Sequence, residues 1–183
     1  MNSFRKWCYY GVVKNNQGGT KMKEVYPNLY VGTQADYERN QQGFKEWKVV
    51  HTCKEPYHRK ALGYKGRGAP KESPYYFYLY DANNHLILNI VDTDSPEFFN
   101  DEMIDEAVKY CIDGLKTNRK VLVHCNQGES RAPSLVLLLL RRIGHYNCSF
   151  EEAVEDFKTL YPGFNPKRGI FTYVRNRWYE NNN

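Results

Sequence analysis

The sequence predicts an α/β fold with three layers, in which helices flank a central and mostly parallel sheet. Short apolar runs rich in β-branched or aromatic residues lie at 49–53, 85–91 and 121–124, and each has a length typical of a strand. Apolar residues recur at helical spacing from 103 to 115, and a leucine-rich helix is expected after residue 131. Strands that alternate with helices favour a parallel sheet covered by helices.

The chain is expected to form one domain, because its 183 residues are enough for one complete core and few for two. Residues 1–22 contain several Gly and Asn and little periodicity, so we expect an N-terminal extension there and the folded domain over 23–183. No window holds the roughly eighteen apolar residues of a membrane helix, and the first residues lack the apolar core of a signal peptide. The expected location is the cytoplasm.

The cysteines and the charge narrow the class further. Cys8, Cys53, Cys111, Cys125 and Cys148 are odd in number and lack metal-ligand spacing, which argues against a disulfide framework or a zinc site and favours a reducing compartment. The net charge of +5 predicts a mild attraction to anions. Because the basic residues are spread along the chain, a nucleic-acid partner is not expected.

The first half of the chain is expected to start with a strand at 25–32. Thr33, followed three residues later by Asp36, predicts the start of a short helix that runs toward residue 42 and ends at Gly43. The strand at 49–53 follows it.

Residues 54–73 hold six Lys or Arg and two Glu, with glycines and prolines, and predict a long loop. Either this loop lines the approach to an anionic substrate or it is a solvated loop without a role in binding. Residues 75–80 and 85–91 then predict a hairpin around Asn83-Asn84.

The second half is predicted to be mainly helical. Ser95 before Pro96 suggests a helix start, and the helix should continue to about residue 116. Three further helices are expected: from the loop after the 121–124 strand to about 143, before Gly144; from Ser149, which with Glu152 forms a capping box, to 160; and from Asn165-Pro166 to about 179.

The segment between the 121–124 strand and the next helix has the features of a phosphate-binding loop that carries a nucleophile. Cys125 ends the strand and Arg131 begins the helix, where unpaired backbone N–H groups and the helix dipole favour an anion. Gly128 removes a side chain where the loop must approach its ligand most closely. Arg131 can bind two phosphate oxygens at once, and the same field favours the nucleophilic thiolate of Cys125.

Singly, Cys125 is more often a buried structural thiol and Arg131 a solvated helix residue. Their spacing relative to each other instead favours a phosphate-binding loop over these two ordinary roles. The pattern His124-Cys125-x-x-Gly128-x-x-Arg131 resembles the signature of the cysteine-dependent protein tyrosine phosphatases, and Ser130-Arg131-Ala132-Pro133-Ser134 resembles that of their dual-specificity branch. The resemblance covers roughly 25–179, where the opening strand also resembles theirs, and is weak in the extension and the basic loop.

The resemblance implies a protein tyrosine phosphatase-like fold, a catalytic domain over 23–183, and hydrolysis of phosphate monoesters through a phosphocysteine intermediate. It implies Cys125 and Arg131 as catalytic residues, with His124 and Ser134 in supporting roles, and it implies no cofactor and no metal. The residues implied to bind the substrate phosphate are Asn126, Gln127, Gly128, Glu129, Ser130 and Arg131. We expect the acidic Glu129 side chain to point outward, because the loop amides point in.

A proton donor for the leaving oxygen is expected on another loop, where the family places an aspartate some thirty residues before the cysteine. Asp92 and Asp94 both qualify. We choose Asp92, because it directly follows the apolar run that ends at Val91, whereas Asp94 next to Ser95-Pro96 has the position of a turn residue. Both aspartates would be simple turn residues if the loop had no catalytic role.

One position departs from the family. Where the family usually has Ser or Thr directly after the arginine, this chain has Ala132. In the family that hydroxyl helps the cysteine sulfur to leave, so we expect normal phosphoryl capture, slow release and burst kinetics. Ser130 or Ser134 could substitute for that hydroxyl, although neither is in the matching position.

Protein phosphotyrosine is the expected substrate, with phosphoserine or phosphothreonine as further substrates. Non-protein substrates such as inositol phosphates, phosphoinositides or RNA 5′-phosphates usually require more basic loops than one with Asn126, Gln127 and Glu129, although the 54–73 segment could compensate. A phosphate-binding module without activity is a third reading, motivated by Ala132. A rhodanese-like sulfurtransferase also uses a cysteine loop but has no use for Asp92.

Overall fold

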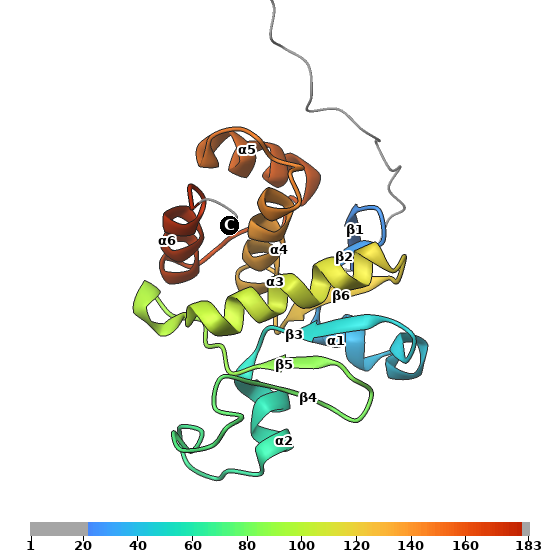
Figure 1. Ribbon diagram of the computed structural model, residues 1–183, viewed down its shortest axis with the longest axis vertical. Coiled ribbons are helices and arrows are strands. Elements are labelled where there is room, and N and C mark those ends of the chain that lie inside the picture. The colour runs from blue at the N-terminus through green and yellow to red at the C-terminus, as the bar shows by residue number, and fades with distance from the viewer. Residues whose placement is uncertain (1–21, 181–183) are drawn as a thin grey trace, which may run out of the picture.

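The computed structural model describes residues 22–180, in which one six-stranded sheet is flanked by helices (Figure 1). The expected extension at 1–22 therefore lies, apart from Met22, outside the described residues. The strands are β1 (Lys23–Tyr26), β2 (Leu29–Thr33), β3 (Lys48–His51), β4 (Tyr78–Tyr80), β5 (Leu86–Leu88) and β6 (Val121–Cys125). The helices are α1 (Gln34–Glu38), α2 (Arg59–Leu62), α3 (Asp101–Lys116), α4 (Arg131–Arg142), α5 (Phe150–Leu160) and α6 (Arg168–Arg177).

The strand order β1-β2-β6-β3-β5-β4 places β6 at the centre of the sheet. The pairs β2–β6, β6–β3 and β3–β5 are parallel, and only the two edge pairs are antiparallel, so the prediction of a mostly parallel sheet is confirmed. Thr33 and Cys125 are paired at the same end of the sheet, next to the pair His51 and His124. Parallel pairing thus gathers the carboxyl ends of β2, β3 and β6 at one edge, the usual place for a ligand in such a sheet.

The helices form two unequal layers. The long helices α3 to α6 lie on one side of the sheet in Figure 1, and with Val121 and Val123 of β6 they form the main core. On the opposite face, Leu122 packs with Tyr37 of α1 in a smaller cluster. The alternation of β6 side chains between the two clusters explains why the whole strand is buried. Among the described residues, every helix is too short or too polar to span a lipid bilayer.

Local signals fix several helix ends. Thr33 and Asp36 form the predicted capping box of α1, and Ser149 and Glu152 form that of α5. Gly144 follows α4 with φ of 76°, a left-handed conformation in which glycine carries no penalty. These starts and stops are confirmed.

Other boundaries were predicted wrongly. The helix after Thr33 ends at Glu38, and a 3₁₀ helix, η1 (Gln41–Phe44), replaces its expected second half. The start of the expected long loop is ordered as a helical turn, η2 (Lys54–His58), followed by α2.

The prediction that Ser95 starts the long helix was also wrong. Pro96 begins only a 3₁₀ turn, η3 (Pro96–Phe98), and Asn100 caps α3 by accepting from the Met103 N–H at 2.9 Å. An Asn side chain is as good an N-cap as Ser, so the cap residue nearest the periodic segment decided the boundary. The last helix likewise begins at Arg168, three residues after Asn165.

The capping box of α5 yields a stability prediction. Ser149→Ala removes the hydroxyl that accepts from the Glu152 N–H, so the free energy of unfolding should fall by about 0.5–2 kcal/mol. Urea unfolding monitored by circular dichroism measures this. Thr159→Ala, an exposed hydroxyl deletion within the same helix, is the control, and an equal loss in both variants would contradict the prediction.

Candidate active site

The predicted phosphate loop lies at the carboxyl edge of the sheet, between β6 and α4. Cys125 is the last residue of β6 and Arg131 the first of α4, with exposed fractions of 1% and 8%. The loop between them is therefore as short as the sequence predicted. The opening N–H groups of α4 have no carbonyl partners within the helix, so they are available to an anion at this end.

Gly128 allows the loop to pass close to its neighbours. Its φ is 72°, and an added Cβ would lie 3.0 Å from the carbonyl oxygen of Gly32 and 3.2 Å from the Tyr161 hydroxyl oxygen. Tyr161 donates its hydroxyl to the Gly128 carbonyl at 2.9 Å. Burial raises the pKa of Tyr161 to about 12, so the hydroxyl keeps its proton and holds the loop at neutral pH.

The Arg131 guanidinium is oriented by two acceptors and keeps one buried donor free. Nη2 donates to Asn126 Oδ1 at 2.7 Å and Nη1 donates to the Ile90 carbonyl at 3.3 Å. The buried Nε has no hydrogen-bond partner within the described part of the chain. Since buried donors are nearly always paired, an oxyanion ligand in the loop is the natural acceptor for this N–H group.

Asp92 lies against the loop. Ser130 donates its hydroxyl to Asp92 Oδ1 at 2.8 Å, and Arg131 Nε lies 4.0 Å from the same oxygen. The Asp92 side chain is 26% exposed, so it faces both the loop and solvent. Asp94 is exposed on the following bend. Of the two predicted candidates, Asp92 is the one that contacts the loop.

His124 is fully buried beneath the loop. Its Nε2 lies 2.6 Å from Nδ1 of His51, and its carbonyl accepts from the Thr52 hydroxyl at 2.7 Å. Burial lowers the pKa of His124 to about 3, so the ring is neutral. These contacts hold the backbone from which Cys125 projects.

The remaining predicted residues divide by exposure. Gln127 and Glu129 have exposed side chains, as expected for Glu129, so only their backbone can serve a ligand inside the loop. Ala132 and Ser134 are buried in the first turn of α4, and the Ser134 hydroxyl has no hydrogen-bond partner among residues 22–180.

Several supporting residues were not predicted from the sequence. Asn126 Nδ2 donates to Gln34 Oε1 at 2.7 Å and to the Glu55 carbonyl at 2.9 Å, which ties the loop to the starts of α1 and η2. The backbone N–H of Lys167 donates to Ser130 Oγ at 3.0 Å. These partners are far apart in the sequence and no local pattern marks them.

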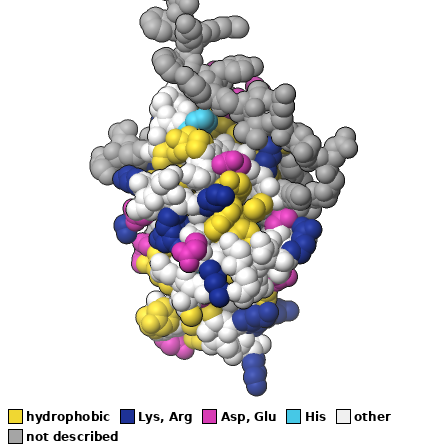
Figure 2. Space-filling view, turned by 90° about the vertical axis from the view of Figure 1, so that its right-hand side faces the viewer, with side chains coloured by type: hydrophobic (Ala, Val, Ile, Leu, Met, Phe, Trp, Pro, Cys, Tyr) yellow, Lys and Arg dark blue, Asp and Glu magenta, His cyan; other side chains and the backbone are white. Residues whose placement is uncertain are grey.

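The basic 54–73 segment contacts the site through its first residues: the Glu55 carbonyl accepts from Asn126, and the Tyr57 ring lies 5.3 Å from that of His124. Arg59 is held by Glu55 at 2.7 Å, whereas Lys60, Lys65, Arg67 and Lys71 are exposed. Figure 2 shows Lys and Arg side chains at the lower end of the molecule, the end where α2 lies in Figure 1, and mixed charges elsewhere on that face.

The amino-acid sequence is similar to proteins named dual specificity protein phosphatase. The chain is 29% identical over 148 residues to dual specificity protein phosphatase 26 of Mus musculus and of Homo sapiens, which covers 80% of this chain and 62% of each relative. The chain therefore spans less than two thirds of these relatives' length. No family model matches the chain.

Solved structures agree in fold. The crystal structure of DUSP15 superposes with a TM-score of 0.61 at 19% identity, covering 88% of this chain and 89% of that one. Human DUSP28 superposes with a TM-score of 0.58 at 16% identity, covering 88% and 95%. The chain has a protein tyrosine phosphatase-like fold. The sequence similarity also confirms the predicted resemblance to the dual-specificity phosphatases.

Gly169 at the start of α6 sets the position of the segment that follows Asp92. A Cβ at this position would lie 2.2 Å from the Thr93 carbonyl oxygen and 2.9 Å from that of Ser95. Gly169→Ala should therefore push this segment away and lower the free energy of unfolding by about 1–3 kcal/mol. Urea unfolding tests this, with Gly163→Ala as control, since a Cβ there makes only ordinary contacts. Two equally stable variants would contradict the prediction.

Proposed function

We propose that the chain is a cysteine-dependent phosphatase that hydrolyses phosphate monoesters through a phosphocysteine intermediate, with 23–183 as its catalytic domain. The observation that carries the proposal is the loop itself: Cys125 and the buried Nε of Arg131, which has no hydrogen-bond partner among the described residues, lie at the two ends of one strand-to-helix turn, with Asp92 against it. Cys53, Cys111 and Cys125 form no disulfide within the described residues, which supports a reducing compartment, and we propose the cytoplasm.

In the first step, the Cys125 thiolate attacks phosphorus and forms the S–P bond while the ester O–P bond breaks. Asp92, as a carboxylic acid, gives its proton to the departing alkoxide or phenoxide oxygen. Arg131 and the loop N–H groups bind the three equatorial oxygens, whose charge they stabilise in the transition state.

In the second step, water attacks phosphorus, Asp92 accepts the water proton, and the S–P bond breaks to return the thiolate and release inorganic phosphate. Ala132 provides no hydroxyl to hydrogen-bond the departing sulfur. Release is therefore expected to be the slower step.

Protein phosphotyrosine is the proposed substrate, with phosphoserine and phosphothreonine as further ones. The similarity to proteins named dual specificity protein phosphatase supports this choice. The exposed side chains of Gln127 and Glu129 are uncharged and acidic, respectively, so they give the loop no positive charge for a highly anionic substrate. An inositol phosphate, phosphoinositide or RNA 5′-phosphate would have to rely on the basic residues after η2.

The direct test is hydrolysis of para-nitrophenyl phosphate by the purified chain. Activity should disappear in Cys125→Ser, because the serine hydroxyl is far less ionised at neutral pH than a thiol in this position. Cys148→Ser, which changes a partly buried cysteine outside the loop, is the matched control and should remain active. An inactive parent that still binds phosphate or tungstate would instead identify a phosphate-binding module.

The role of Asp92 predicts a dependence on the leaving group. Asp92→Asn should lower turnover of a phosphotyrosine peptide by about 100-fold or more, because phenolate is then expelled without a proton. Aryl phosphates with acidic phenols should be hydrolysed almost normally. Asp94→Asn, which changes an exposed carboxylate two residues away, is the control. Equal rates of the Asp92 variant and the parent on phosphotyrosine would remove Asp92 from the mechanism.

Ala132 predicts burst kinetics. Rapid mixing should show a fast release of phenol equal to the enzyme concentration, followed by a slow steady state, and acid quenching should trap the phosphoenzyme. Ala132→Ser should raise the steady-state rate about ten- to a hundredfold, the value of one hydrogen bond to a charged sulfur. A linear time course without a trapped intermediate in the parent would refute the slow release step.

A further inference from the structure

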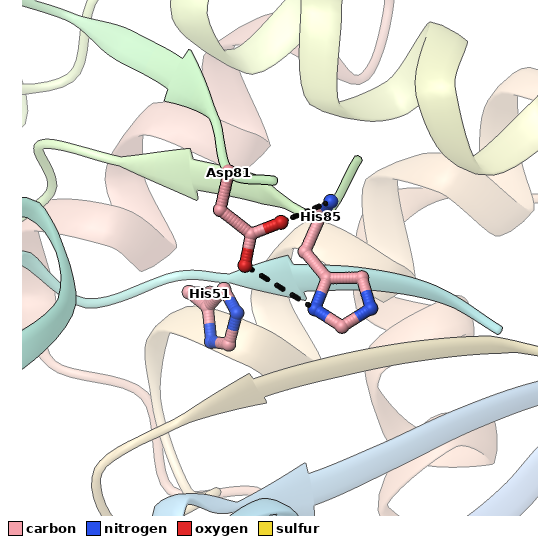
Figure 3. Close-up of side chains that lie close together, drawn as sticks. All are labelled: His51, Asp81 and His85. Carbon is pink, nitrogen blue, oxygen red and sulfur yellow. Dashed lines mark hydrogen bonds and ion pairs between the residues drawn. The ribbon is translucent and has the colours of Figure 1, made fainter. Parts of the chain in front are cut away.

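On the face of the sheet covered by α1, three polar side chains converge outside the phosphate loop. Figure 3 shows His51 of β3 together with Asp81 and His85, the two ends of the turn between β4 and β5. One ligand atom from each residue lies within 4.8 Å of the others. We propose that His51, Asp81 and His85 form a site for a divalent transition metal ion of the zinc class.

The distances are close to those that an ion requires. Zinc lies about 2.0–2.2 Å from nitrogen and oxygen ligands, so tetrahedral ligands are roughly 3.3–3.5 Å apart. Nδ1 of His85 and Oδ2 of Asp81 are already 3.6 Å apart. The other ligand atoms are at most 4.8 Å apart, so side-chain rotations that move them by on the order of an ångström would bring them to the ligand spacing of zinc.

The second contacts of each residue leave one ligand atom facing the others. Nδ1 of His51 is engaged by His124, which leaves Nε2 for an ion. Oδ1 of Asp81 accepts the backbone N–H groups of Asn83 and His85, which leaves Oδ2. Metal ligands in proteins are typically oriented by such outer hydrogen bonds.

His85 supplies the strongest argument. Its Nε2 lies 3.3 Å from the Phe44 carbonyl oxygen and its Nδ1 lies 3.6 Å from the Asp81 carboxylate. A neutral imidazole has one N–H, so with the proton on Nε2 the Nδ1 lone pair is directed at a carboxylate oxygen. The Tyr37 hydroxyl, 3.5 Å from Nδ1, is a weak substitute donor at that distance. A cation between Nδ1 and Oδ2 satisfies both atoms.

The surroundings suit a bound ion. His51 and His85 are each 1% exposed, and burial lowers the pKa of both rings, so they are neutral ligands at pH 7. Asp81 is 26% exposed and provides both a negative charge and a path from solvent. Two imidazoles and one carboxylate favour zinc over calcium or magnesium, which prefer oxygen ligands only. The fourth position is open to water.

This site differs from the expectation of no metal, which rested on the sequence. The three residues come from two separate segments, and their spacing along the chain matches no metal-binding motif. The strand order, which places β3 beside β5, brings them together.

The test is titration of tag-free Cys125→Ser protein with Zn²⁺ by calorimetry, since this background removes the loop thiol as a competing ligand. We expect one ion per chain with a Kd at or below about 10 µM, and a melting temperature raised by about 5–10 °C at 100 times the Kd. Asp81→Asn and His85→Gln should each weaken binding at least about tenfold. His145→Gln, which changes an exposed histidine outside the cluster, should bind like the parent.

Cobalt provides a second readout on the same Cys125→Ser chain. Co²⁺ bound at His51, Asp81 and His85 should show tetrahedral d–d absorption without a thiolate charge-transfer band. Absence of saturable Zn²⁺ binding, equal binding by Asp81→Asn, or a thiolate band would each overturn the proposal. If His85→Gln fails to fold, the partly exposed Asp81 decides the question alone. None of these readouts depends on phosphatase activity.

Discussion

One buried hydroxyl links the candidate acid directly to the phosphate loop that carries the nucleophile. Ser130, 5% exposed, donates to Asp92 at 2.8 Å and accepts the Lys167 N–H at 3.0 Å. One side chain thus joins the phosphate loop, the segment after β5 and the start of α6. Asp92 and Cys125 belong to different segments. The Ser130 bond to the Asp92 carboxylate, about 1.5–3 kcal/mol, and the Lys167 N–H bond to Ser130, about 0.5–1.5 kcal/mol, therefore act directly on their separation.

The other contacts that hold the phosphate loop come from the same edge of the sheet. Because β6 pairs in parallel with β2 and with β3, the turns that follow both neighbours flank the phosphate loop. Gly128 lies against Gly32 and Thr33 at the end of β2, and Asn126 donates to Gln34 after β2 and to Glu55 after β3. The loop is therefore positioned by the strand order, and its short sequence motif supplies only the chemistry.

The contrast between local motifs and contacts set by the strand order also determines what could be predicted from the sequence. Features set by neighbouring residues were predicted: the capping boxes at Thr33 and Ser149, the stop at Gly144 and the loop from Cys125 to Arg131. The predicted start of the long helix was wrong because two local signals competed. Ser95-Pro96 is a good helix start, but Asn100 is an equally good one and directly precedes the periodic apolar residues of α3.

Contacts between distant segments left no pattern to find. The partners of Asn126 lie 92 and 71 residues away, and the Lys167 contact with Ser130 spans 37 residues. The helical turn η2 contains a proline and sits in a glycine-rich, basic segment, so a loop was the reasonable expectation there. Such features depend on tertiary packing, which overrides local preference.

The first turn of α4 carries two buried polar groups that have no hydrogen-bond partner within residues 22–180, Arg131 Nε and Ser134 Oγ. Leaving a buried polar group unpaired costs about 1–3 kcal/mol, and more for a charged one. A ligand that pairs even the first of them recovers this cost on binding, so an anion should bind more tightly than the loop amides alone would allow. This free energy is gained when the phosphoryl group binds. Ala132, which lies between the two groups, offers no hydroxyl to stabilise the departing sulfur in the second step. We therefore expect strong binding with slow release.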